Sequence, residues 1–306
     1  MKVLVTGGAG FIGSHLVERL LNESVIKKIV IVDYCKNGVE NIKHLLGNKK
    51  IKLVKLNIIN LKKNNKNFKS IDCVFHLAAI IDMSSSINEP LSYYNTNVVG
   101  TLNALEAMRH HNINKIVYAA SASCYGITQK TPISETSKIQ LNFPYAFTKY
   151  SAEQLIDHWS KVYGINYFSL RLFNVYELKS MMSSSYNSVI NIFLKQNLLK
   201  KPLTVVGDGN QSRDFVNVKD VCEAFVKAFK SNKKNKIINI GSSKSVKIIK
   251  IAKIISNRIF FLPKRDGEAN SSRANISKAK KILNWKPKIN FIHDIKQTFN
   301  NKKNQK

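Results

Sequence analysis

The sequence predicts a doubly wound α/β fold, in which helices cover both faces of a parallel sheet, followed by a smaller α/β lobe. Three observations predict this. Short apolar runs alternate with amphipathic segments over residues 1–172, a glycine-rich turn follows the first run, and the alternation breaks after about residue 174. We therefore expect one domain over residues 1–173 and a second lobe over residues 174–306, with some interleaving of the chain between them.

The individual elements follow from the spacing of apolar residues. Buried parallel strands are predicted where the apolar runs are short, at residues 3–6, 29–32, 51–56, 73–77, 116–119 and 167–172. Helices are predicted where apolar residues recur at three and four positions, at residues 11–21, 94–110 and 145–163. In the second lobe, the pattern predicts a helix at 186–199 and strands at 203–206 and 215–218.

Composition excludes several classes of protein. The chain has 306 residues, 44% of them hydrophobic, which is enough for a substantial core and excludes a disordered or disulfide-stapled chain. The formal net charge of +30 comes mostly from Lys mixed with Asn and Ile, which indicates a solvated surface rather than a polyanion site, so a nucleic-acid-binding protein is the less favoured reading. The four cysteines lack metal-ligand spacing, and no apolar run reaches 18 residues or resembles a leader peptide. We expect no metal, no nucleic acid, no membrane, and a cytoplasmic location.

A glycine motif points to a dinucleotide. Gly7, Gly10 and Gly13 lie between the first predicted strand and the first helix, where glycine lets the backbone approach a pyrophosphate at the helix N-terminus. Asp33 ends the second strand, where a carboxylate accepts hydrogen bonds from the adenosine ribose and repels a 2′-phosphate. This pairing predicts a Rossmann domain that binds NAD in preference to NADP, although Lys36 lies close enough in sequence to leave the choice open.

Three residues form a candidate catalytic set. Tyr145 and Lys149 are four apart on a predicted helix, so they lie on one face, and Ser121 ends a predicted strand. An ammonium about 5 Å from a phenol contributes roughly 3 kcal/mol toward the phenolate, or about two pKa units. Tyr145 would then be a general base for a hydroxyl, with Ser121 donating to the same oxygen and Lys149 also holding the nicotinamide ribose.

These residues, with further motifs in order along the chain, resemble the extended short-chain dehydrogenase/reductase family, and within it the nucleotide-sugar 4-epimerases. The motifs are TGGAGFIG, HLAA at 76–79, NVVGT at 97–101, PYAFTK at 144–149, RLFNVY at 171–176, GDGNQSRDF and ISKAKKILNWKP. The resemblance implies NAD as cofactor, a UDP-sugar as substrate, and a homodimer that pairs residues 94–110 and 145–163 across a two-fold axis.

The resemblance also assigns roles to individual positions. The expected cofactor-binding residues are Gly7, Gly10, Phe11, Ile12, Gly13, Asp33, Asn57, Ile58, Leu77, Ala78, Ala79, Asn97, Tyr145, Lys149 and Leu172. The expected substrate-binding residues are Ser123, Asn174, Val189, Thr204, Val205, Val206, Arg213, Arg265, Glu268 and Ser272. Asn57 stands where the family usually has Asp, which keeps the acceptor and removes the charge.

The absence of acidic residues after Ser121 narrows the type of reaction. The related 4,6-dehydratases carry acids after the strand-end hydroxyl residue, whereas this chain has Ala122 and Ser123, so 4-epimerisation of UDP-glucose or its N-acetylated form is expected. A UDP-glucuronate epimerase and a non-catalytic NAD-binding sensor stay open. Ser272 is small enough to admit an acetamido group, or it simply caps a loop over a glucose site. Glu177 replaces a usual glycine, and strain from a positive φ is expected there.

Overall fold

The computed structural model describes residues 1–127, 130–178, 188–264 and 270–303, with side chains described as far as Phe299 at the C-terminal end. It contains two compact units. The first comprises Met1–Cys124, Phe143–Arg171 and Cys222–Ile238, and the second comprises Tyr125–Asn142, Leu172–Val221 and Asn239–Lys306. Residues 125–142 thus belong to the second unit, and residues 222–238 return to the first.

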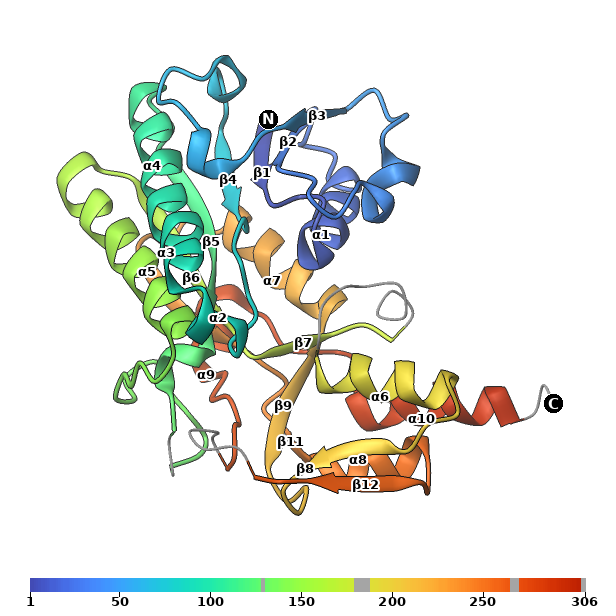
Figure 1. The fold of residues 1–306 in the computed structure, drawn as a ribbon. Helices are drawn as coiled ribbons and strands as arrows, with labels where there is room; N and C mark the ends of the chain where they lie inside the picture. Colours follow the sequence, from blue (N-terminus) through green and yellow to red (C-terminus); the bar gives the residue numbers. More distant parts are fainter. Residues whose placement is uncertain (128–129, 179–187, 265–269, 304–306) are drawn as a thin grey trace. The chain divides into compact units, whose positions relative to one another are not determined.

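A seven-stranded sheet forms the centre of the first unit (Figure 1). Its order is β10-β6-β5-β4-β1-β2-β3, from β1 (Lys2–Thr6), β2 (Lys28–Asp33), β3 (Ile51–Lys55), β4 (Cys73–His76), β5 (Lys115–Ser121), β6 (Asn166–Leu172) and β10 (Lys236–Ile240). The pairs from β3 through β5 are parallel. The strand order reverses between β1 and β4, which is where doubly wound sheets bind ligands. The predicted fold class is confirmed.

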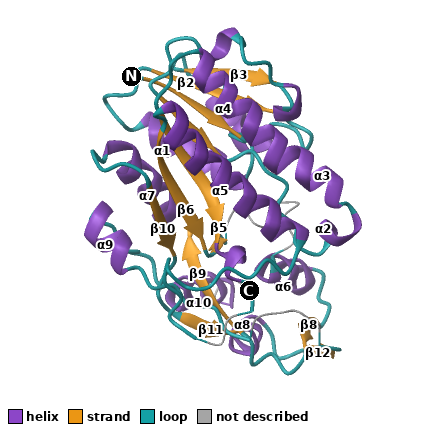
Figure 2. Ribbon diagram, turned by 90° about the vertical axis from the view of Figure 1, so that its left-hand side faces the viewer, coloured by secondary structure: helices purple, strands orange, loops and turns teal. Residues whose placement is uncertain are grey.

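Helices cover both faces of this sheet (Figure 2). One face carries α1 (Phe11–Leu21) and the part of α7 (Val218–Lys230) that belongs to the first unit, and the other carries α2 (Ser85–Asn88), α3 (Pro90–Tyr94), α4 (Gly100–His110) and α5 (Pro144–Tyr163). The continuous helix expected over residues 94–110 was wrong in one respect, because a π-helical turn, Asn95–Val99, separates α3 from α4. Such turns are frequent at functional sites.

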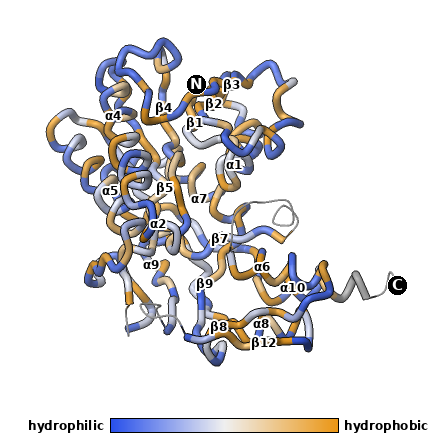
Figure 3. Tube along the Cα trace, in the orientation of Figure 1, coloured by the Kyte–Doolittle hydropathy of each residue, from blue (hydrophilic) through white to orange (hydrophobic). Residues whose placement is uncertain are grey.

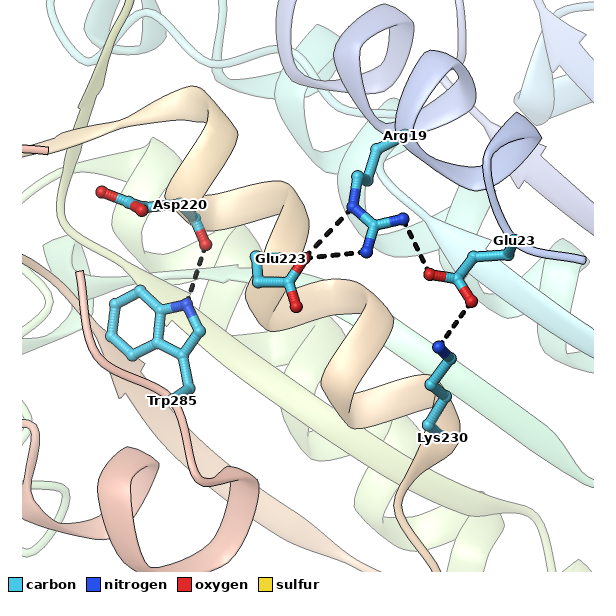
Figure 4. A network of polar contacts seen from close by, with 6 residues as sticks. All are labelled: Arg19, Glu23, Asp220, Glu223, Lys230 and Trp285. Carbon is cyan, nitrogen blue, oxygen red and sulfur yellow. Dashed lines mark hydrogen bonds and ion pairs between the residues drawn. The ribbon is translucent and has the colours of Figure 1, made fainter. Parts of the chain in front are cut away.

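An ionic cluster joins α1 to α7 (Figure 4). Arg19 donates to Glu223 through Nε and Nη2 at 3.1 and 2.9 Å and to Glu23 through Nη1 at 2.7 Å, while Lys230 lies 2.5 Å from Glu23. Basic and acidic side chains alternate through the cluster, so each of the two carboxylates is paired with at least one cation. Residues 222–230 are thereby fixed to the first unit although residues of the second unit precede them in the chain.

Over its described residues, and apart from the start of α7, the second unit contains two small sheets and four helices. The sheets are β11-β9-β7, from β7 (Asn174–Tyr176), β9 (Ser212–Asn217) and β11 (Ser245–Lys247), and β12-β8, from β8 (Leu203–Val206) and β12 (Ile259–Leu262). The helices are α6 (Val189–Leu198), α8 (Ile248–Ile255), α9 (Ser277–Leu283) and α10 (Phe291–Lys303). The strand predicted at 203–206 is confirmed, and the one predicted at 215–218 runs earlier.

Each unit has its own apolar core. In the first, residues of β1, β2, β4 and β5 pack against α4 and α5, and Figure 3 shows these strands as predominantly hydrophobic. In the second, α6, α8 and α10 enclose a cluster that includes Phe193, Phe215 and Phe291. No helix in the described part of the chain is long and apolar enough to cross a membrane. Among the same residues, no group of His, Cys, Asp and Glu could hold a metal ion.

Candidate active site

The glycine-rich turn lies where β1 ends and α1 begins. Gly7 has φ +69°, and a Cβ there would come within 2.7 Å of the Ala78 nitrogen, so only glycine lets this turn lie against the loop after β4. A Cβ on Gly13 would overlap the Gly7 carbonyl oxygen and lie 2.8 Å from the Gly8 Cα. The two loops at the reversal of the strand order therefore touch through backbone, with the N-terminus of α1 facing the same edge.

Asp33, at the end of β2, faces this turn. One carboxylate oxygen accepts the Ala9 N–H at 2.9 Å and the other accepts the Cys35 N–H at 2.7 Å. A carboxylate oxygen accepts more than one hydrogen bond, so both oxygens retain capacity for ribose hydroxyls. The backbone bonds fix the orientation of the carboxylate before any ligand arrives.

The residues after β4 are held by a buried hydrogen-bond chain. Thr6 Oγ1 accepts the N–H groups of Leu77 and Ala78, both at 3.2 Å, and lies 2.7 Å from His76 Nδ1. On the far side of the ring, His76 Nε2 lies 2.9 Å from Thr101 Oγ1. The predicted cofactor positions Leu77 and Ala78 are thus tied to β1 and to α4.

Asn97, in the π-helical turn, links the cofactor loops to the catalytic helix. Its Oδ1 accepts the Ile80 N–H at 2.9 Å, and its Nδ2 donates to the Ile80 carbonyl and to Thr148 Oγ1, each at 3.0 Å. Thr148 in turn donates to the Tyr145 carbonyl at 3.0 Å. Asn97 is 1% exposed, so its role in this structure is to hold the loop after β4 against α5.

The remaining predicted cofactor positions lie at strand and helix ends of the first unit, apart from Leu172. Asn57 Oδ1 accepts the Ile59 N–H at 3.1 Å and begins a short 3₁₀ turn, and Ile58 is buried against Gly100, where a Cβ would come within 2.6 Å of its side chain. Asn is sufficient for this capping bond, which needs an acceptor and no charge. Leu172 ends β6 and is 9% exposed.

Ser121 and Tyr145 are carried by elements that pack together. Ser121 ends β5, and its Oγ accepts from both the Oγ–H and the N–H of Ser123, at 2.8 and 3.2 Å. Since these two bonds use acceptor capacity only, the Ser121 hydroxyl proton is free to be donated to another oxygen. Tyr145 lies in the first turn of α5, which begins with Pro144 at a position where proline is favoured.

Lys149 is one turn further along α5 and is 3% exposed. Burial lowers the pKa of its ammonium to about 7, and the carboxylate of Glu153 acts in the opposite direction. Glu153 is itself paired with Arg171 at 2.5 Å, which limits the help that it gives. From the sequence we expected the Lys149 side chain to be fully charged at neutral pH. With a pKa near neutrality, its charge instead depends on which groups contact the ammonium.

The predicted substrate residues that the structure describes lie in the second unit, apart from Ser123. Asn174 donates to the Asp214 carbonyl at 3.3 Å, Arg213 precedes Asp214 in β9, and the Ser272 N–H donates to the Ser212 carbonyl at 3.0 Å. These positions therefore lie around one strand. Thr204, Val205 and Val206 belong to β8, where Val205 is fully buried, and Val189 begins α6.

Two further expectations concern the second unit. Arg265 and Glu268 lie outside the described residues. The strain expected at Glu177 was wrong, because Glu177 is not among the described residues with positive φ. Its side chain is 9% exposed and lies directly after β7, where a glycine is not needed.

Sequence reasoning missed the buried polar residues that hold the site. Thr6, His76, Thr101 and Thr148 form the hydrogen bonds described above, and the buried Asp214 carboxylate fixes β9 by accepting from the Ser242, Ser243 and Ala274 N–H groups. His76 lies in the HLAA motif, from which only Leu77, Ala78 and Ala79 were expected to contribute to the site. Polar residues within otherwise apolar segments were the available signal, since buried polar groups require partners.

The fold and the glycine-rich turn together define a class: a doubly wound α/β protein with a turn of the dinucleotide-binding type at the reversal of its strand order. The chain belongs to the NAD dependent epimerase/dehydratase family, whose model matches residues 3–241. It is accordingly an NAD-dependent enzyme of the nucleotide-sugar epimerase/dehydratase group. The glycine cradle and the oriented Asp33 carboxylate fit that cofactor.

Known relatives match the chain along its whole length. A UDP-glucose 4-epimerase of Lactobacillus helveticus is 32% identical over 96% of this chain and 94% of its own. The structure of a UDP-N-acetylglucosamine 4-epimerase from Methanobrevibacter ruminantium M1, in complex with UDP-N-acetylmuramic acid, superposes with a TM-score of 0.89 at 31% identity, covering 100% and 99% of the two chains. A UDP-glucuronic acid 4-epimerase from Bacillus cereus, in complex with UDP-glucuronic acid and NAD, gives 0.90 at 31%, covering both chains completely.

Proposed function

We propose that this chain is a UDP-hexose 4-epimerase that acts on UDP-glucose or UDP-N-acetylglucosamine. The observation that carries the proposal is the arrangement of Ser121, Tyr145 and Lys149 on β5 and α5, with Ala122 and Ser123 where a dehydratase would need an acid. This set moves a proton to and from one hydroxyl and has no second acid to expel water. Epimerisation needs nothing more from the protein than that proton transfer.

In the proposed reaction, Tyr145 removes the proton of the sugar 4-hydroxyl and later returns it. Ser121 donates its free hydroxyl proton to the same oxygen, which stabilises the negative charge that develops there. Lys149, when protonated, stabilises the Tyr145 phenolate and holds the nicotinamide ribose. NAD held by the glycine-rich turn and Asp33 would supply the hydride acceptor and donor at carbon 4. Because the 4-keto sugar would turn over about its diphosphate between the two transfers, the configuration at carbon 4 would invert with no net oxidation, and the cofactor would stay bound.

We propose that residues of the second unit bind the diphosphate and the nucleoside of the substrate. Arg213 is suited to a phosphate because a planar guanidinium binds two oxygens together. Asn174, Val189, Ser123 and the β8 residues are proposed to contact the sugar and uridine, with Arg265 and Glu268 beside the diphosphate. Ser272 is proposed to leave room for an acetamido group. A cytoplasmic location and a homodimer belong to the same proposal.

The direct test is proton NMR of the purified protein with UDP-glucose, UDP-N-acetylglucosamine and UDP-glucuronate in separate tubes, without added NAD. We expect the galacto anomeric signal to appear with the first or second substrate. Tyr145→Phe should slow conversion by about 100-fold or more, since it removes the general base. Tyr150→Phe, on the same helix, is the matched control and should convert at the wild-type rate.

Each outcome decides something. Conversion of UDP-glucuronate alone would replace the proposed substrate with an acidic sugar. An unchanged rate in Tyr145→Phe would contradict the mechanism. If no substrate is converted even after NAD is added, the epimerase proposal fails, and an NAD-binding sensor becomes the better reading.

A further inference from the structure

The ring of Tyr118 lies directly against the ammonium of Lys149. Nζ of Lys149 is 4.3 Å from the ring centroid, and the Tyr118 hydroxyl donates to the Lys149 carbonyl at 3.2 Å. Tyr118 is 1% exposed, so this contact is fully desolvated. A cation over the face of an aromatic ring is attracted by the ring quadrupole, and more strongly when water is excluded.

The opposite face of this ring is covered by a neutral group. His76 stacks on Tyr118 with centroids 5.7 Å apart and an interplanar angle of 22°. Thr6 Oγ1 already accepts two N–H bonds, so its proton goes to His76 Nδ1, and His76 must donate from Nε2 to Thr101. Burial and the nearby Lys149 lower the pKa of His76 to about 3, so no second cation competes for the ring.

The other titratable groups around Lys149 stabilise its charge only in part. Glu153 on α5 attracts the ammonium, but its carboxylate accepts from Arg171 and Ser169. Tyr145 lies on the same helix, and Tyr93 of α3 faces Tyr145 at 6.4 Å between centroids. The π-helical turn packed against α5 carries no titratable side chain. The ring of Tyr118 is therefore the group in direct contact with the buried charge.

We propose that Tyr118 is a positioning residue for Lys149: its ring binds the ammonium and holds it charged and in place beside Tyr145. The hydroxyl of Tyr118 is secondary, because it bonds to the backbone of Lys149 and not to the ammonium. This inference rests on the proposed catalytic role of Lys149.

Titration of Lys149 tests the inference without any sugar. Protein with ¹³C and ¹⁵N in its lysine side chains is followed by NMR across pH, at matched NAD content, and Lys149 is assigned by the signal missing in Lys149→Met. We expect Tyr118→Leu to lower the pKa of Lys149 by roughly 0.5 to 1.5 units, whereas Tyr118→Phe keeps the ring and leaves it within about 0.3 unit. The alkaline limb of kcat should move to lower pH in parallel.

Phe229→Leu is the matched control. Its ring lies 5.6 Å from the ammonium of a different, half-buried lysine, Lys115, so its loss should leave the Lys149 titration unchanged. Should Tyr118→Leu not fold, successive fluorination of the ring in Tyr118→Phe weakens the quadrupole without changing its shape much, and the pKa should fall with each fluorine. An unchanged pKa in Tyr118→Leu or across the fluorinated series, or an equal fall in unfluorinated Tyr118→Phe, overturns the proposal. A shifted titration with no epimerisation of any sugar would refute the proposed function and leave this inference standing.

Discussion

At the scale of single residues, the site depends on buried polar groups whose protons are all accounted for. His76 is 0% exposed, yet it accepts from Thr6 and donates to Thr101, which donates onward to the Asn97 carbonyl. One neutral imidazole thus connects the glycine-rich turn, the loop after β4 and the helix that carries Asn97. Burial of a polar group is tolerated only because both ring nitrogens have partners.

His76→Asn tests this arrangement through its pH dependence. The amide replaces the Nδ1 acceptor but leaves Thr101 without its donor, so we expect a loss of about 1–3 kcal/mol in the free energy of unfolding at pH 7.5. Because the pKa of His76 is lowered to about 3 in the folded state, the unfolded state binds the extra proton between pH 6.5 and 3, and wild-type stability falls as pH falls through this window.

His76→Asn lacks the titrating imidazole, so its free energy of unfolding does not fall in this way. The difference in unfolding free energy between wild type and variant should therefore shrink by about 2 kcal/mol between pH 7.5 and pH 5. Urea unfolding at both pH values measures the deficit. Exposed His293 supplies the control, since His293→Asn should change neither value. A deficit that stays constant across pH would show that His76 is not held neutral.

At the scale of elements, the turn between β1 and α1 has no room for side chains at two of its glycines. In Gly13→Ala, the new Cβ would overlap the Gly7 carbonyl and push the turn away from Ala78. We expect NAD affinity to fall by about 100-fold, which corresponds to about 3 kcal/mol, as measured by quenching of protein fluorescence. Gly47→Ala is the control because nothing lies within 4 Å of its Cβ position. Equal affinities in the two variants would place the pyrophosphate elsewhere.

The elements that sequence could predict are those with a local signal. Helix α1 was predicted with its observed bounds, and the strands of the first half lie within two residues of prediction, because a buried run reads directly as a strand. The π-helical turn was missed because the helical pattern expected over residues 94–110 continues through Asn95–Val99, and no local feature of the sequence separates this turn from an α-helix. The place of β10 at the sheet edge depends on pairing with distant β6, which no local pattern encodes.

The same distinction holds within the site. Gly7, Gly13 and Asp33 could be proposed because the glycines and the strand-end acid form a motif that is local in the sequence, and their contacts with NAD stay a prediction. Tyr118 could not, because an aromatic residue in a buried strand reads as core. What makes it more than core is the ammonium of Lys149, thirty-one positions away on another element. The substrate positions of the second unit stay predictions.

At the scale of the whole molecule, the net positive charge opposes association of two copies, whereas exposed apolar surface favours it. The chain has 49 Lys and Arg against 19 Asp and Glu, so 30 basic groups cannot pair one to one with an acid. Exposed apolar side chains nevertheless occur within residues 94–110 and on α5, among them Tyr94 at 44% and Val162 at 54% exposure. These two segments are the proposed dimer contact, where two strongly positive copies would have to meet.

This opposition predicts that salt strengthens the dimer. Repulsion between the net charges is screened as ionic strength rises, whereas burial of apolar surface is not weakened by salt. We expect the dissociation constant, measured by sedimentation equilibrium, to fall several-fold between about 0.05 and 0.5 M NaCl. The double variant Tyr94→Lys/Val162→Lys should be largely monomeric at both concentrations, while Val25→Lys/Phe260→Lys adds the same charge at exposed apolar positions outside residues 94–110 and 145–163 and should remain dimeric. A dimer that weakens as salt rises would be held by ion pairs instead, and equal dissociation of the two double variants would remove these segments from the interface.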